Sequence, residues 1–206
     1  SADRLLDKTE IDEELFEDFK IFRFGSISMI NETSREATKY ALDLAEQQEM
    51  IVSYDPNLRE SLWEDLDKAK KIMKSVLGQV DILKVSKEEL DFLTGFEAIE
   101  EGAEQIKNKN QISIVLVTDG ENGVYLYKDE LIHVPAKKVK AVDTTGAGDA
   151  FISAFLTKIN ESDVNLKQIS NEELKSYCQF ANQCSALVVQ KEGAMTKLPK
   201  REEINE

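Results

Sequence analysis

The chain has 206 residues, of which 41% are hydrophobic, and a formal net charge of −14 at pH 7. This length favours a single domain spanning residues 1–206, with enough apolar residues for a sizeable core. Surfaces that bind nucleic acid or anionic membranes need basic patches, whereas the acidic residues here are spread along the whole sequence. We therefore expect neither of these partners.

Cysteine and histidine usage also narrows the classes of function. Cys178 and Cys184 fall in one predicted helix, on different faces, so we expect two unpaired thiols in a reducing cytoplasm. No apolar run reaches the roughly 20 residues of a membrane span, and no signal peptide is recognisable. His133 is the sole histidine, which leaves little material for histidine-based metal sites or catalytic triads.

Apolar runs alternate with amphipathic segments from the N-terminus to about residue 117. A capped helix start is predicted at Thr9–Glu14, where acidic residues follow a threonine. Strands are predicted at Lys20–Phe24, Met50–Tyr54, Asp81–Val85 and Ile112–Val117, and helices at Thr33–Gln48, Asp65–Leu77, Glu88–Leu93 and Glu100–Lys109. The buried face of the first long helix is predicted to carry Ala37, Tyr40, Ala41, Leu44 and Ala45. This alternation predicts a parallel sheet with helices on both faces.

The last part of the chain has a different order of elements. Gly123–Tyr127 and Leu131–Val134 are predicted to form a hairpin, followed by helices at Ala147–Ile159 and Asn171–Gln190. Binding sites of parallel α/β sheets lie beyond the carboxyl ends of the strands. We therefore expect four segments that follow strands to converge: Gly25–Ser26, Asp55–Arg59, Ser86–Glu89 and Thr118–Gly123.

One stretch, Val142–Phe151, stands out because small residues precede a run of good helix formers. Gly146, Ala147 and Gly148 let an anion approach the backbone closely. The first N–H groups of the helix that follows are unpaired donors at its positive end. Asp149 is unexpected beside an anion, so it either does chemistry, binds a metal or caps the helix.

Asp143-Thr144-Thr145-Gly146-Ala147-Gly148-Asp149-Ala150-Phe151, continued by Ser153-Ala154-Phe155-Leu156, resembles the C-terminal signature of the PfkB (ribokinase-like) sugar kinases. The resemblance implies a ribokinase-like three-layer α/β/α fold with a mostly parallel central sheet. It also implies that Asp149 is the general base on a sugar hydroxyl. The N–H groups of Gly146, Ala147 and Gly148 would form the anion hole for the transferring phosphoryl group, which fits the need of such reactions for positioning and charge stabilisation.

The segment Asp55–Trp63 supports two interpretations. Asp-Pro-Asn is common turn chemistry and needs no function. The whole segment also resembles the one after a central strand in the bacterial fructokinases of this family. By that resemblance, Asn57 and Arg59 contact the sugar.

The segment Ser86–Glu89 occupies the place of the family's Asn-x-x-Glu motif, with Ser86 in place of Asn. By resemblance Glu89 supports Mg²⁺ through water, since Mg²⁺ is usually held by few carboxylates and several waters. Lys84 resembles a lysine used on the ATP phosphates. The alternative for Glu89 is an acidic helix start without a ligand.

The remaining resemblances concern the nucleotide and a cation. The loop after residue 117 is either a simple turn or part of the wall around the ATP ribose and phosphates, formed by Thr118, Gly120 and Gly123. By resemblance, Asn182, in Phe180–Ala186, occupies the adenine-contact position, and Gly193 also belongs to the ATP site. Lys191–Ala194 matches a loop that closes a site for a monovalent cation such as K⁺. Its ligands would be Asp143 and the carbonyl groups of Thr145, Val188, Lys191 and Gly193.

The resemblance runs from Ala2 to the C-terminus, but the family's N-terminal third has no counterpart among these residues. That third carries the first strands, a small β lid and several sugar contacts, so we expect the isolated chain to be poorly stable and catalytically weak.

The implied reaction is ATP-dependent phosphorylation of fructose to fructose 6-phosphate. A 2-keto-3-deoxygluconate kinase, another PfkB sugar kinase and a catalytically silent nucleotide-binding fragment are the alternatives, and a homodimer is left open.

Overall fold

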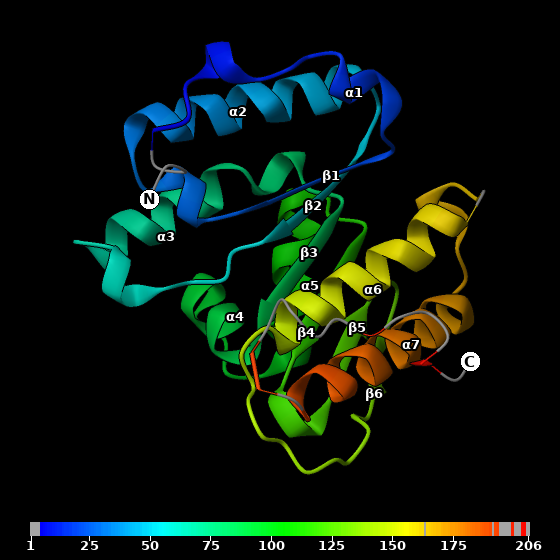
Figure 1. Ribbon diagram of the computed structural model, residues 1–206. Coiled ribbons are helices and arrows are strands. Elements are labelled where there is room, and N and C mark those ends of the chain that lie inside the picture. The colour runs from blue at the N-terminus through cyan, green and yellow to red at the C-terminus, as the bar shows by residue number, and fades with distance from the viewer. Residues whose placement is uncertain (1–4, 163, 191, 194–198, 200–202, 205–206) are drawn as a thin grey trace. The chain divides into compact units, whose positions relative to one another are not determined.

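The computed structural model describes residues 5–162, 164–190, 192–193, 199 and 203–204. The contacts divide the chain into two compact units, Ser1–Val115 and Leu116–Glu206. The six strands follow the order β1-β2-β3-β4-β5-β6 (Figure 1), and β4 (Ile114–Thr118) crosses the boundary between the units.

The first unit is built on parallel strands. β1 (Ile21–Gly25) pairs with β2 (Ile51–Asp55), which pairs with β3 (Ile82–Ser86), and both pairings are parallel. Strands covered on both faces need continuous apolar runs, and Ile82, Leu83 and Val85 are fully buried. The parallel arrangement predicted from the alternating pattern is therefore confirmed in this unit.

The helices of the first unit follow the predicted positions within a few residues. They are α2 (Glu32–Gln47), α3 (Leu66–Ser75), α4 (Lys87–Thr94) and α5 (Ile99–Asn110). α2 packs on β1 and β2 through a face that includes Ala37, Ala41 and Ala45. Tyr40, predicted on this face, is only half-buried, because its hydroxyl group turns toward the Glu13 carboxylate and hydrogen-bonds to it.

The N-terminal helix prediction was wrong in position and length. The structure has a 3₁₀ turn at Lys8–Glu10 and a separate short helix, α1 (Leu15–Asp18). The cap is Asp7 rather than Thr9: the Asp7 carboxylate accepts the Thr9 N–H at 2.9 Å, and the Glu10 carboxylate accepts the Asp7 N–H at 2.9 Å. A capping box that starts two residues earlier thus begins a single turn, which ends at Ile11.

The second unit contains the predicted hairpin and two long helices. β5 (Val124–Tyr127) pairs antiparallel with β6 (Leu131–Val134). α6 (Ala147–Glu161) packs against α7 (Asn171–Val189), and α7 also contacts both strands of the hairpin. Cys178 and Cys184 are free and buried in α7, as predicted, and burial raises the pKa of the Cys184 thiol to about 11.

Short 3₁₀ turns were not predicted from the sequence. Turns of three residues carry too little periodicity to register as elements. They lie at Ile27–Met29, Glu60–Leu62, Leu77–Gln79, Gly120–Asn122 and Leu166–Gln168.

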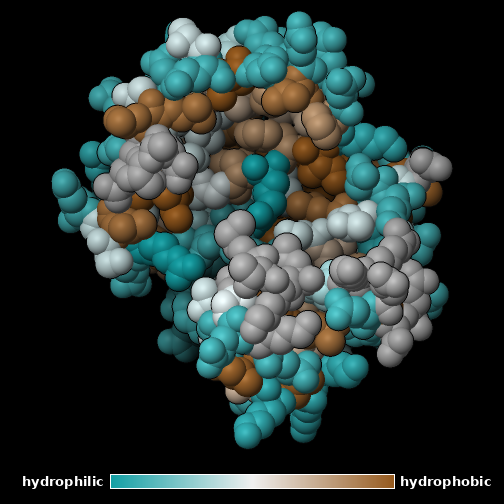
Figure 2. Space-filling view, in the orientation of Figure 1, coloured by the Kyte–Doolittle hydropathy of each residue, from teal (hydrophilic) through white to brown (hydrophobic). Residues whose placement is uncertain are grey.

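The visible face carries both hydrophilic and broad hydrophobic areas (Figure 2). Large apolar side chains are also exposed near the N-terminus, among them Leu5, Leu15 and Phe19. Among the residues that the structure describes, we find no helix with the length and apolarity that crossing a membrane requires.

Gly123 is expected to tolerate no side chain. Its φ of 104° is rarely adopted by residues with a Cβ, and a Cβ there would overlap the Val134 carbonyl oxygen and lie 2.5 Å from the Ala136 nitrogen. Gly123→Ala should therefore lower the free energy of unfolding by about 1–3 kcal/mol from backbone strain alone. Gly78→Ala is the control, because in the described part of the chain nothing lies within 4 Å of the place that its Cβ would take. Equal urea midpoints for both variants would contradict this explanation.

Candidate active site

In the first unit, hydrogen bonds donated by backbone N–H groups join the loops that follow the parallel strands. The Ser26 N–H, after β1, donates to the Pro56 carbonyl oxygen, after β2, at 3.0 Å. The Leu58 N–H donates to Glu89 Oε1, in the first turn of α4 after β3, at 2.6 Å. The predicted convergence of these three loops is therefore confirmed within this unit.

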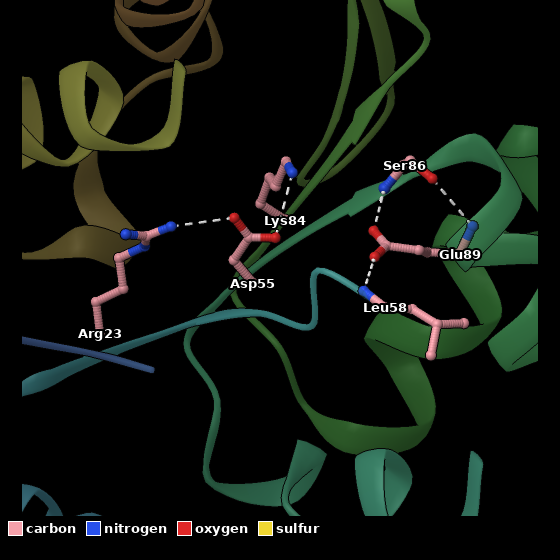
Figure 3. Close-up of polar contacts among 6 residues, drawn as sticks. All are labelled: Arg23, Asp55, Leu58, Lys84, Ser86 and Glu89. Atoms are coloured by element: carbon pink, nitrogen blue, oxygen red, sulfur yellow. Dashed lines mark hydrogen bonds and ion pairs between the residues drawn. The ribbon is translucent and has the colours of Figure 1, made fainter. Parts of the chain in front are cut away.

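A charged cluster lies on one face of the three strands (Figure 3). The Asp55 carboxylate is 2% exposed, and it accepts from Lys84 Nζ at 3.2 Å and from Arg23 Nη2 at 3.1 Å. Because side chains alternate along a strand and Arg23 pairs in register with Ser53, Arg23 and Asp55 lie on the same face. Two cations thus share one buried carboxylate.

Sequence reasoning missed Asp55 and Arg23 as members of this cluster. A signal was present in the sequence, since Lys84 interrupts the apolar strand Ile82–Ser86 and is 7% exposed. A buried lysine requires a counter-charge. The identity of that partner depends on strand register, which the sequence pattern alone does not show.

Glu89 makes contacts with two segments of backbone. Ser86 caps α4 by accepting the Glu89 N–H at 3.2 Å, and Glu89 Oε2 accepts the Ser86 N–H at 2.7 Å, which completes a capping box. Glu89 Oε1 accepts from Leu58 (Figure 3). One carboxylate therefore fastens both the start of α4 and the loop after β2.

Several predicted residues surround one polar cavity of about 270 Å³ in the first unit. Asn57, Lys84 and Glu89 line it, whereas Arg59 is exposed and does not. Asn57 has a φ of 46°, a left-handed conformation that asparagine tolerates better than most residues. The complete lining is Asn57, Leu58, Glu60, Lys84, Ser86, Glu88, Glu89 and Phe92.

The oxygen donors around this cavity fit Mg²⁺ only if a bound ligand supplies part of its coordination. Within the described ranges there is no group of three or more His, Cys, Asp or Glu side chains that could hold a metal ion. Mg²⁺ commonly uses one or two carboxylates together with waters and substrate phosphates. The carboxylate of Glu89 at the cavity is compatible with that mode of binding.

In the second unit, α6 begins with the small-residue loop as predicted. Gly146 precedes the helix with a φ of 83°, so the left-handed position of this loop falls on a glycine. The first N–H groups of a helix have no carbonyl partner within it. However, the Ala147 N–H donates to the Thr144 carbonyl oxygen at 3.2 Å, so this predicted anion-hole donor is engaged in the turn. Asp149 lies exposed in the first turn of α6.

The C-terminal half of α7 holds this loop. Ser185 Oγ donates to the Ala147 carbonyl oxygen at 3.0 Å. The Val142 and Asp143 N–H groups both donate to the Val189 carbonyl oxygen, at 2.7 and 3.1 Å. The start of α6 is therefore fixed from outside the helix.

Asp143 contacts two other residues of the predicted monovalent-cation site. Asp143 Oδ1 accepts the Thr145 N–H at 2.8 Å, and Asp143 Oδ2 accepts the Gly193 N–H at 3.3 Å. These hydrogen bonds, those to Thr145 foremost, lower the pKa of the Asp143 carboxyl group. The Val188 carbonyl oxygen accepts the Gln190 N–H, and Lys191 lies outside the described residues. A carboxylate that stays ionised is compatible with a bound cation.

Asn182, the predicted adenine contact, has a structural role in the hairpin region. Its side chain is buried, and Nδ2 donates to the carbonyl oxygens of Val134 and Pro135 at 3.2 and 3.1 Å. Since both N–H bonds are used, an adenine contact through Nδ2 would require one of these hydrogen bonds to break. Gly123 is explained by close packing in the turn after β4, while Thr118 ends β4 and Gly120 lies in that turn.

Comparisons with known proteins cover almost the whole chain. The profile of the pfkB family carbohydrate kinases matches residues 1–201. Fructokinase-1 from Oryza sativa subsp. japonica is 40% identical over 205 residues, which are 99% of this chain and 63% of that protein. This chain therefore spans less than two thirds of that relative.

Solved structures agree with the sequence comparison. The fructokinase from Vibrio cholerae O395 in its fructose, ADP and calcium ion bound form is similar with a TM-score of 0.88 at 34% identity, covering 98% of this chain and 64% of that one. A fructokinase with bound ATP from Xylella fastidiosa gives a TM-score of 0.89 at 28% identity, covering 98% and 65%. The predicted ribokinase-like fold is confirmed by these similarities.

Proposed function

Because this chain belongs to the pfkB family of carbohydrate kinases, we propose that the protein transfers the γ-phosphoryl group of ATP to a hydroxyl group of fructose. The observation that carries the proposal is the loop Gly146–Gly148 at the start of α6, followed directly by Asp149. It supplies oriented N–H donors and a carboxylate within one turn. The fructokinase names of the similar proteins support fructose as the acceptor.

In this proposal, Asp149 accepts the proton of a primary sugar hydroxyl group. The oxygen attacks the γ-phosphorus, and the bond between that phosphorus and the β,γ-bridging oxygen breaks, which releases ADP. The N–H groups of Gly146 and Gly148 stabilise the charge on the transferring group. Ala147 contributes its N–H only when the bond to the Thr144 carbonyl oxygen is exchanged.

The other predicted residues have supporting roles. Lys84 binds the ATP phosphates, and its ion pair with Asp55 holds the ammonium group at the polar cavity. Glu89 holds Mg²⁺ through water, and Mg²⁺ supplies neutralisation of phosphate charge. Asn57 and Arg59 bind the sugar. The ATP site also includes Thr118, Gly120, Gly123, Asn182 and Gly193. A monovalent cation such as K⁺ is bound by Asp143 together with Thr145, Val188, Lys191 and Gly193.

The cytoplasm is the proposed location, supported by two free buried cysteines.

A 2-keto-3-deoxygluconate kinase is the second candidate. Asp55–Arg59 keeps the Asp-Pro-Asn-x-Arg pattern shared with those enzymes, and the exposed Arg59 could pair with an acid sugar. An ADP-release assay on the full-length protein, with Mg-ATP and a panel of fructose, glucose, ribose and 2-keto-3-deoxygluconate, separates the two. We expect saturable turnover with fructose. Preference for the acid sugar would replace the first candidate, and tight ATP binding without turnover on any sugar would reject both.

Gly148→Val tests the anion hole. The branched side chain enters the first turn of α6, where the phosphoryl group must approach the backbone. Loss of an oriented donor in such a site raises the barrier by about 2.7–4 kcal/mol, so kcat should fall by about 10²–10³. Ser153→Val is the matched control, because it places the same side chain at an exposed position of the same helix. If Gly148→Val folds and keeps the parental kcat, the loop serves only as a helix cap.

A further inference from the structure

Glu89 connects the loop that carries Asn57 and Arg59 to the first turn of α4. Its two carboxylate oxygens accept from different segments, Oε1 from the Leu58 N–H at 2.6 Å and Oε2 from the Ser86 N–H at 2.7 Å (Figure 3). Both distances lie at the short end of the range for hydrogen bonds to a carboxylate, which are stronger than neutral ones. A capping role alone would use only the second of these bonds.

The loop 56–59 requires outside support to keep its shape. Asn57 has the left-handed φ of 46°, which a free chain rarely adopts. Within the described part of the chain, hydrogen bonds hold this loop from other segments at Pro56, through the Ser26 N–H, and at Leu58, through Glu89. The Leu58 bond is the one made by a side chain, and it lies directly after the strained residue.

We propose that Glu89 is a positioning residue for the sugar: it fixes loop 56–59 in the conformation that presents Asn57 and Arg59. This inference rests on the proposed function, and it adds sugar affinity to the Mg²⁺ role already assigned to Glu89. The carboxylate is suited to both roles, since each oxygen accepts one backbone N–H and has a second lone pair.

Glu89→Ala is the test, because it removes both acceptor oxygens and leaves the Leu58 and Ser86 N–H groups without this partner. In the full-length protein we expect the KM for fructose to rise about tenfold or more, since small displacements of positioning groups have effects of this size. We expect hydrogen exchange at the Leu58 amide to accelerate about tenfold as its bond is lost.

Two control variants separate anchoring from other effects. Asp91→Asn removes an exposed carboxylate from the same helix and should leave the fructose KM and Leu58 exchange unchanged. Ser86→Ala removes the acceptor for the Glu89 N–H but keeps both carboxylate bonds. It should therefore weaken the start of α4 without accelerating exchange at Leu58.

The outcomes distinguish the inference from the proposed function. Unchanged Leu58 exchange in Glu89→Ala, or accelerated exchange with a parental fructose KM, would overturn the positioning role. A rise in the KM for Mg-ATP alone would leave Glu89 with the Mg²⁺ role only, which also overturns it. If the parent enzyme phosphorylates no sugar, the proposed function fails. The inference then fails as well, even if exchange at the Leu58 amide shows that Glu89 holds the loop.

Discussion

Asp149→Asn should lower kcat for sugar phosphorylation by about 10²–10⁴ in the full-length protein, the usual contribution of a general base. The amide keeps the size of the side chain but cannot accept the hydroxyl proton. Asp149 lies exposed in the first turn of α6, so the substitution disturbs no buried packing. Affinity for ATP, measured by calorimetry, should stay close to that of the parent.

The control for this variant is Glu172→Gln, which removes an exposed carboxylate from the first turn of α7. The two substitutions have the same expected effect on helix electrostatics, because both remove an acid near a positive helix end. Only Asp149→Asn should affect kcat. Activity of Asp149→Asn within about threefold of the parent would remove this residue from the role of base.

Asp55→Asn should lower the free energy of unfolding by about 3–5 kcal/mol, the usual effect of removing one partner of a buried ion pair. Lys84 is 7% exposed and would be left without its carboxylate. Arg23 contributes less to this loss, because its side chain is 34% exposed and water can replace the lost contact. The measurement is urea denaturation, with stability compared at equal m-values.

A second variant tests whether the buried charge causes that loss. In Asp55→Asn with Lys84→Met, no unpaired ammonium group is left inside, so much of the stability should return. Lys84→Met should abolish the assigned phosphate contact as well, so its readout is stability alone. A single Asp55→Asn variant within about 1 kcal/mol of the parent would show that the Asp55–Lys84 pair contributes little.

The strands and long helices were predictable because their apolar periodicity is strong. Val52, Leu83 and Val115, for example, are buried in the predicted strands. The Asp55–Lys84 pair was not predictable, since the two residues are 29 positions apart and meet only through the register of β2 and β3. The start at Asp7 was missed because Thr9 is also a residue that commonly caps helices.

The candidate site shows the same division between local and long-range information. The loop at Gly146–Asp149 was predicted because a local motif and a helix start coincide there. The contacts of Asn182 were missed, because its partners at Val134 and Pro135 are backbone carbonyls 48 and 47 residues away. The contact between Glu89 and the Leu58 N–H was missed for the same reason, since no side-chain pattern marks it.

The most direct test of the central proposal is the identity of the product formed from fructose and Mg-ATP. The full-length protein is incubated with both, and phosphorus NMR with mass spectrometry locates the new phosphate ester. The proposal predicts a single monoester at the C6 hydroxyl group, formed in equal amount with ADP and formed about 10²–10⁴ times more slowly by Asp149→Asn. Release of inorganic phosphate without an ester, or an ester formed equally well by Asp149→Asn, would contradict it.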